Sequence, residues 1–120
     1  MLQYVNQACK SGGGITEFGE EEATMGQLFA AIRKLVAEDK YVVGKHAAER
    51  LEERGIMEWQ AVAGLDDGQL ITERLEAVPN AAVEVCETLP DGTEFKAVWS
   101  YLRQSGVAKL VTVHFFDEDW

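Results

Sequence analysis

A histidine and two arginines recur every four residues in the segment KHAAERLEERGI, residues 45–56. His46, Arg50 and Arg54 therefore lie along one side of a predicted helix, because a helix turns once every 3.6 residues. An imidazole can donate or accept a proton near neutral pH, and a guanidinium can hold the charge of a phosphate or a carboxylate. A second histidine, His114, follows near the end of the chain. These residues could form an acid–base site if the two imidazoles meet in one cleft.

The same row also has a purely structural interpretation. On a helical wheel, Ala47 and Leu51 define the buried side, and the row lies on the flank beside them. Long basic side chains on such a flank lay their stems on apolar surface and expose their charged ends. The arginines would then pair with Glu53 or with acidic residues of a sheet, and would hold the helix against that sheet. We favour this interpretation, because ion pairs on helix surfaces are far more common than catalytic sites.

The sequence offers little for a metal ion or a cofactor. His46 and Glu49 have helical i, i+3 spacing, and His114 is followed by Asp117 and Asp119. Neither group matches the spacing of a zinc-protease helix or of a cysteine cluster. We therefore predict no metal site and no cofactor.

The charge of the chain argues against a nucleic-acid partner. Eleven lysines and arginines stand against 21 aspartates and glutamates, which gives a net charge of −10. Proteins that bind RNA or DNA usually carry a basic stripe, because neutralised phosphates supply most of their affinity. Here Lys45, Arg50 and Arg54 are interleaved with Glu49 and Glu53. RNA is therefore disfavoured as a partner, whereas a protein partner is compatible with this charge.

The aromatic residues are predicted to fill the core rather than to stack on bases, since no rows of lysine or arginine lie between them. They are Trp59, Phe95, Trp99, Phe115 and Phe116. Lys96 and Arg103 remain as candidate cations of the sheet surface.

Nothing in the sequence indicates a membrane or secreted protein. The longest apolar runs are only a few residues, so no membrane span is predicted. The first residues, MLQYVNQACKSGGG, have neither the basic region nor the apolar region of a secretory signal. Cys9 and Cys86 lie far apart without a CxxC spacing, which favours reduced thiols. Together these features predict a cytoplasmic protein.

The chain divides into a leader and one domain. Residues 1–22 combine a triple glycine with three consecutive glutamates and are predicted to form a flexible acidic and glycine-rich leader. Residues 23–120 are predicted to form a single α+β domain, which must then position the candidate residues named above.

Two helices are predicted at the start of this domain. The first begins at Thr24, the N-cap of a capping box, and its apolar residues recur at helical spacing to about residue 39. The second covers about 45–54. Gly55 is predicted to end it in the left-handed conformation, with Ile56 packing back on the helix.

A third, shorter helix is predicted over 58–65, with Trp59, Val62 and Leu65 on one side. Beyond the turn at 66–68 the apolar period changes from 3.6 to 2, which is typical of strands. The predicted strands cover residues 69–75, 82–89, 94–102 and 108–116.

Turn signals connect the last three of these strands. The sequence PDG lies between the second and the third strand, and RQSG lies between the third and the fourth. These turns predict an antiparallel meander. The expected fold is α+β, with N-terminal helices packed on a four-stranded antiparallel sheet.

The order of these elements and their residues resemble a known family. KHAAERLEERGI is followed by a short helix, the strand GQLITE, the hairpin PDGTEFKAVWSY and the final strand LVTVHFFDED. This succession, over residues 41–119, resembles the bacterial family called domain of unknown function 4258. The resemblance implies the fold of the RelE/ParE toxin-like superfamily of small α+β proteins. Many of those are toxins that cut messenger RNA, usually on the ribosome, or that poison gyrase.

The resemblance carries over to five positions. His46, Arg50 and Arg54 match the helix motif of the family, and Thr112 and His114 match the end of its last strand. In a ribonuclease, histidines would transfer protons and an arginine would hold the charge of the transition state. The chain departs from the pattern at His114, where tyrosine is more usual. Its acidic balance is a second departure, because RelE-like nucleases are typically basic.

We therefore predict a non-catalytic, protein-binding module on a RelE-like toxin scaffold, with an antitoxin-like protein or a second copy as its partner. One alternative is an endoribonuclease (mRNA interferase) toxin of a toxin–antitoxin pair, with His46, Arg50, Arg54 and His114 as catalytic candidates. Another is a self-associating structural domain with an exposed strand edge or the first helix as its interface.

Overall fold

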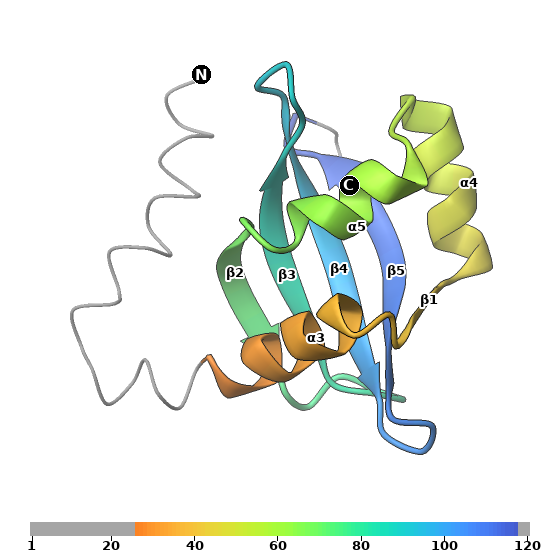
Figure 1. Ribbon diagram of the computed structural model, residues 1–120, viewed down its shortest axis with the longest axis vertical. Helices are drawn as coiled ribbons and strands as arrows, with labels where there is room; N and C mark the ends of the chain where they lie inside the picture. The colour runs from red at the N-terminus through yellow and green to blue at the C-terminus, as the bar shows by residue number, and fades with distance from the viewer. Residues whose placement is uncertain (1–25, 118–120) are drawn as a thin grey trace.

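The computed structural model describes residues 26–117, in which three helices pack on a five-stranded mixed sheet (Figure 1). Helices α3 and α5 lie across one face of the sheet, and α4 lies beside β5. The predicted α+β class is therefore confirmed. The elements in chain order are α3 (Gln27–Ala37), β1 (Tyr41–Val43), α4 (Lys45–Arg54), α5 (Glu58–Gly64), β2 (Gln69–Arg74), β3 (Ala82–Thr88), β4 (Glu94–Leu102) and β5 (Val107–Phe115).

The sheet has one more strand than the sequence predicted. Its order is β1-β5-β4-β3-β2, and the four predicted strands form the expected antiparallel succession. The prediction of a wholly antiparallel sheet was wrong, because β1 pairs in parallel with β5, with Tyr41 opposite Ala108 and Val43 opposite Leu110. Three residues are too few to show a period of two, and their partner strand comes at the other end of the described chain.

The core lies between the helices and one face of the sheet. Helix α3 buries Phe29, Ile32 and Val36 at the predicted helical spacing. On β4, Phe95 and Trp99 are completely buried, as predicted for alternate residues of a half-covered strand. Removing this apolar surface from water is the main favourable contribution to the stability of the fold.

Some sequence predictions fall outside residues 26–117. These are the leader at 1–22, the capping role of Thr24, Cys9 and the residues after 117. Helix α3 begins at Gln27. Cys86 is described: it is buried on β3 and disulfide-bonded, so the prediction of a reduced thiol was wrong for this residue.

Helix α4 ends as its sequence predicts. Gly55 has φ of 69° and donates its N–H to the carbonyl of Glu52 at 3.2 Å. The N–H of Ile56 bonds to the carbonyl of Leu51 at 2.9 Å, and both of these side chains are buried. This double hydrogen bond with its apolar contact is a Schellman motif, which satisfies carbonyls that a helix end leaves open.

Replacing Gly55 with alanine is expected to lower the free energy of unfolding by about 1 kcal/mol, because a Cβ is unfavourable at positive φ. The loss is conformational, since a Cβ at this position meets nothing within 4 Å. Chemical denaturation of Gly55→Ala and Gly55→Asn measures it. Asparagine tolerates the left-handed region better, so equal losses in the two variants would contradict this explanation.

Helix α5 is oriented differently from the prediction. Ala61 and Leu65 face the core, whereas Trp59 is 61% exposed. On a helical wheel, Trp59 lies about 140° from the direction that Ala61 and Leu65 share, so burying those two turns it outward. The predictions that Trp59, Val62 and Leu65 share a buried side and that Trp59 is a core residue were therefore wrong for Trp59. Phe115 and Phe116 are half-buried.

Candidate functional site

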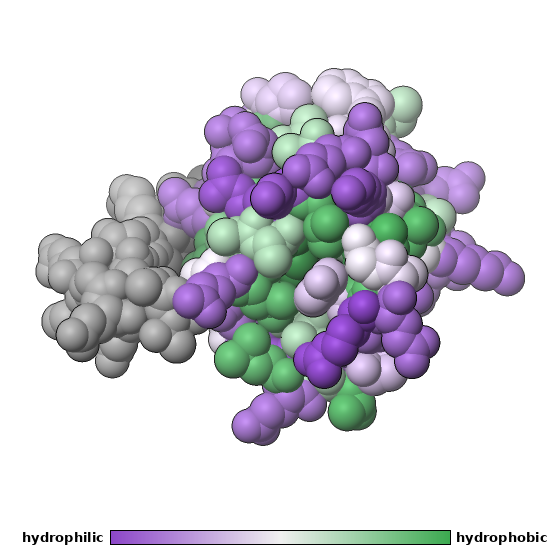
Figure 2. Space-filling model, turned by 60° about the horizontal axis from the view of Figure 1, so that its bottom comes forward, coloured by the Kyte–Doolittle hydropathy of each residue, from purple (hydrophilic) through white to green (hydrophobic). Residues whose placement is uncertain are grey.

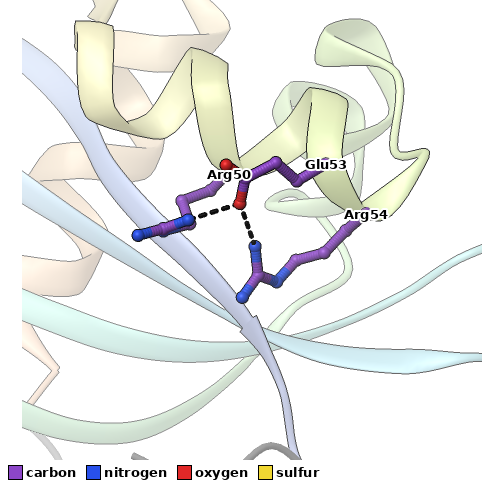
Figure 3. A network of polar contacts seen from close by, with 3 residues as sticks. All are labelled: Arg50, Glu53 and Arg54. Atoms are coloured by element: carbon purple, nitrogen blue, oxygen red, sulfur yellow. Dashed lines mark hydrogen bonds and ion pairs between the residues drawn. The ribbon is translucent and has the colours of Figure 1, made fainter.

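The two arginines of the helix row share one carboxylate (Figure 3). The Arg50 guanidinium contacts Oε1 of Glu53, and that of Arg54 lies 3.3 Å from the same oxygen. Arg54 is the more buried of the two, with 15% of its side chain exposed. The pairing of both arginines with Glu53, which the structural interpretation of the row predicted, is confirmed. The carboxylate offsets part of the positive charge that a phosphate would otherwise meet at these two guanidinium groups.

The two histidines lie on different parts of the fold. His46 is exposed at the second position of α4. His114 is half-buried near the end of β5, opposite Lys96 of β4. Its neighbour Val113 belongs to the core, and successive strand residues point to opposite faces, so His114 lies on the sheet face away from the helices. The structure thus brings together Arg50 and Arg54, and it separates the histidines into the helix layer and the far sheet face.

A row of polar residues crosses that far face. Glu84 of β3 accepts from Arg74 Nε of β2 at 2.5 Å and lies 3.3 Å from Lys96 Nζ of β4. The Glu84 and Lys96 side chains are only 11% and 9% exposed. With His114 on β5, each of four neighbouring strands places one titratable side chain in this row. Of these four residues, sequence reasoning named Lys96 and His114 but missed Arg74 and Glu84; the only signal for Glu84 is a charge inside an apolar strand.

The threonine of the predicted strand motif lies on the same face. Thr112 pairs with Val98 in register, two residues before His114. Its Oγ1 is buried and has no hydrogen-bond partner among residues 26–117. The polar row and Thr112 are thus the part of the described surface that most resembles a site for proton transfer.

Glu87 is a carboxyl group in the core beneath α5. It is completely buried, and the indole N–H of Trp99 donates to its Oε2 at 3.3 Å. Gly64 of α5 packs against it so closely that a Cβ there would lie 2.9 Å from Oε1. Burial raises the pKa of Glu87 to about 8, against a smaller opposite effect of the Trp99 hydrogen bond. The carboxyl group of Glu87 is therefore mostly neutral at pH 7. Because its side chain is completely buried, a substrate cannot reach it from the solvent.

An apolar groove of about 220 Å³ lies between α3 and α5. The groove is lined by Arg33, Val36, Ala37, Val62, Ala63, Leu65 and Asp66. Arg33 joins the two sides by donating to the Asp66 carbonyl at 2.6 Å. None of the four residues predicted as catalytic lines this groove. On the face around α3, hydrophobic side chains are exposed in the middle, between groups of hydrophilic ones (Figure 2).

Within residues 26–117 no group of three or more histidine, cysteine, aspartate or glutamate side chains is arranged to hold a metal ion. No helix in the same range has the length and apolar character needed to cross a membrane.

Comparison with known proteins places most of this fold in one family. Residues 43–115, more than half of the chain, match the family described as "Domain of unknown function (DUF4258)". The match begins at the end of β1 and includes α4 with its arginines, α5 and all of β2 to β5. Comparisons with curated proteins and with solved structures gave no match. The protein therefore belongs to the DUF4258 family of domains of unknown function, as the helix motif and the order of the strands indicated.

Proposed function

We propose that this protein is a non-catalytic, protein-binding module on a RelE-like toxin scaffold. The observation that carries the proposal is the apolar surface exposed on α5 and beside it. Met57 and Trp59 are 57% and 61% exposed, and Val62 and Ala63 of the same helix line the groove between α3 and α5. Exposed apolar surface of this kind marks interaction sites, and tryptophan and methionine are enriched there.

The charges support binding rather than RNA cleavage. Glu53 occupies both arginines of the helix row, and the chain as a whole carries a net charge of −10. A ribonuclease must attract a polyanion and hold a phosphate whose charge grows in the transition state. The acidic residues around the helix row repel a polyanion and disfavour a growing negative charge on a phosphate.

The endoribonuclease alternative is favoured by one observation, on the other face of the sheet. His114 and Lys96 are cross-strand neighbours, so an imidazole and an ammonium group come from paired positions of β5 and β4. Such a pair could transfer a proton and hold negative charge. This version of the alternative uses His114 without His46 or the helix arginines.

Expression in bacteria without any added partner distinguishes the two functions. For a binding module, growth is expected to continue at the rate of an empty-vector strain. Growth arrest that disappears with His114→Ala would refute the proposal and establish the catalytic alternative. His46→Ala is the matched control, because arrest relieved only by His114→Ala would place the activity on the sheet face.

A further inference from the structure

We infer that the groove between α3 and α5 binds a basic, amphipathic helix of a partner protein, with Trp59 as the main apolar contact. This inference rests on the proposed function and specifies its surface and the chemistry of its partner. The docking strip is defined by Trp59, Val62 and Ala63 of α5 and by Val36 and Ala37 of α3.

The residues of α5 form one continuous side toward the groove. Val62 and Ala63 follow Trp59 by three and four residues, so the indole lies one turn before them on the same side of the helix. Ala63 and Trp59 are both exposed, and Val62 is half-buried at the groove. The strip therefore extends the groove toward the start of α5.

The side chains that line the strip suit the packing of a helix. Ridges of side chains on one helix pack into grooves formed by others, and small residues at the contact allow the closest approach. Here Ala37 and Ala63 line the two sides, and the buried Val36 and Leu65 are at the base. An amphipathic helix can lay apolar residues at i, i+3, i+4 and i+7 along such a strip once the Arg33 side chain, which joins its two sides, moves aside.

The charges around the strip select the partner. Asp66 is 85% exposed at the groove, and further acidic residues surround the strip. The exposed acidic residues near the ends of α3 and α5 are Glu38, Asp39, Glu58, Asp66 and Asp67, against the bases Arg33, Lys34 and Lys40. Arg33 pairs with Asp66 and Lys40 with Glu38, so Asp39, Glu58 and Asp67 stand against Lys34 outside these two ion pairs. An acidic rim around an apolar strip is complementary to a helix with apolar residues on one face and lysines on the other.

Designed peptides test this inference on the full-length protein. The first is a helix of about five turns with leucine on one face and lysine on the other. The second has glutamate in place of lysine, and the third is a scrambled form of the first that keeps its charge but loses its apolar face. Calorimetry measures their affinities. Two-dimensional NMR follows the indole N–H signals, where buried Trp99 is an internal reference.

The Leu/Lys helix is expected to bind with micromolar affinity and to shift the Trp59 signal but not the Trp99 signal. Trp59→Ala and Ala63→Gln are each expected to weaken binding by about tenfold. Both residues are exposed, so the variants are expected to unfold at nearly the wild-type temperature. Leu75→Ala, which truncates an equally exposed apolar side chain outside the groove, is the control that leaves binding unchanged.

Several results would overturn the inference. They are equal binding of the scrambled or the glutamate peptide, absence of binding by any peptide, and binding that the groove variants leave unchanged. A shift of the Trp59 signal with protein concentration alone would instead assign the strip to a second copy of the chain. If no peptide binds and expression still does not arrest growth, the basic-helix partner is excluded while the non-catalytic proposal stands.

Discussion

Replacing Glu87 with glutamine is expected to raise the free energy of unfolding at pH 9 by up to about 5 kcal/mol, and to change it little at pH 4. Burial raises the pKa of this carboxyl from 4.5 to about 8 in the folded protein. Between these values the folded state keeps a proton that the unfolded state has lost, so stability falls as the pH rises through this range. Glutamine stays neutral throughout and can still accept the Trp99 hydrogen bond.

Urea denaturation of wild type and Glu87→Gln at pH 5, 7 and 9 measures this effect. The difference between the two proteins is expected to grow steadily with pH and to level off above pH 8. Glu52→Gln, at an exposed position of α4, is the matched control and is expected to leave the pH dependence in place. Stability curves that run parallel for wild type and Glu87→Gln would show that Glu87 ionises without cost in the folded state.

Replacing Glu84 with leucine is expected to destabilise the fold by about 3 kcal/mol. The Glu84 carboxylate lies 3.3 Å from the Lys96 ammonium, and both side chains are nearly buried. Removing the Glu84 carboxylate leaves the Lys96 ammonium nearly buried without this negative charge, whose attraction offsets the cost of taking the ammonium out of water. Arg74, the other contact of Glu84, is 60% exposed and can be hydrated instead.

A double-mutant cycle separates this cost from the loss of packing. Glu84→Leu with Lys96→Met removes both charges and is expected to recover most of the lost stability, because apolar pairs often replace buried ion pairs at little cost. Arg74→Ala alone is expected to cost less than about 1 kcal/mol, as is usual for an exposed pair. Strictly additive effects of the Glu84 and Lys96 substitutions would mean that the two charges do not interact.

Local signals in the sequence were enough to predict much of this fold. The end of α4 depends on Gly55 and on the carbonyls of Leu51 and Glu52 in the preceding turn. The β3–β4 turn depends on Pro90 to Gly92. Each of these two features therefore follows from residues close together in the sequence. Strand β1 could not be found in this way, because its pairing partner is distant and its three residues have no detectable period. Trp59 was misplaced for a related reason, since the packing of Gly64 of α5 against Glu87 of the distant strand β3 helps to determine which side of α5 is buried.

The candidate site likewise has one part that residues close in the sequence determine and other parts that depend on distant segments. Glu53 lies three residues after Arg50 and directly before Arg54, so their contact is a short-range property of α4. The row on the far sheet face depends on the registers of three strand pairs. Lys96 lies opposite Cys86 on one side and opposite His114 on the other. These registers bring Glu84, two residues before Cys86, within reach of the Lys96 side chain. The apolar groove combines α3 and α5, and neither helix alone indicates it.

The position of β5 between β1 and β4 governs the order in which the fold can be completed. This strand pairs with β4 on one side and with β1 on the other, although it is the last strand of the described chain. During synthesis, β1 therefore has no strand partner until residues 108–110 have left the ribosome. Bringing such distant segments together costs chain entropy and slows folding. A chain interrupted after β4 would lose the strand that pairs with β1 and packs against α4 and α3, so quality control is expected to meet such fragments as unfolded protein.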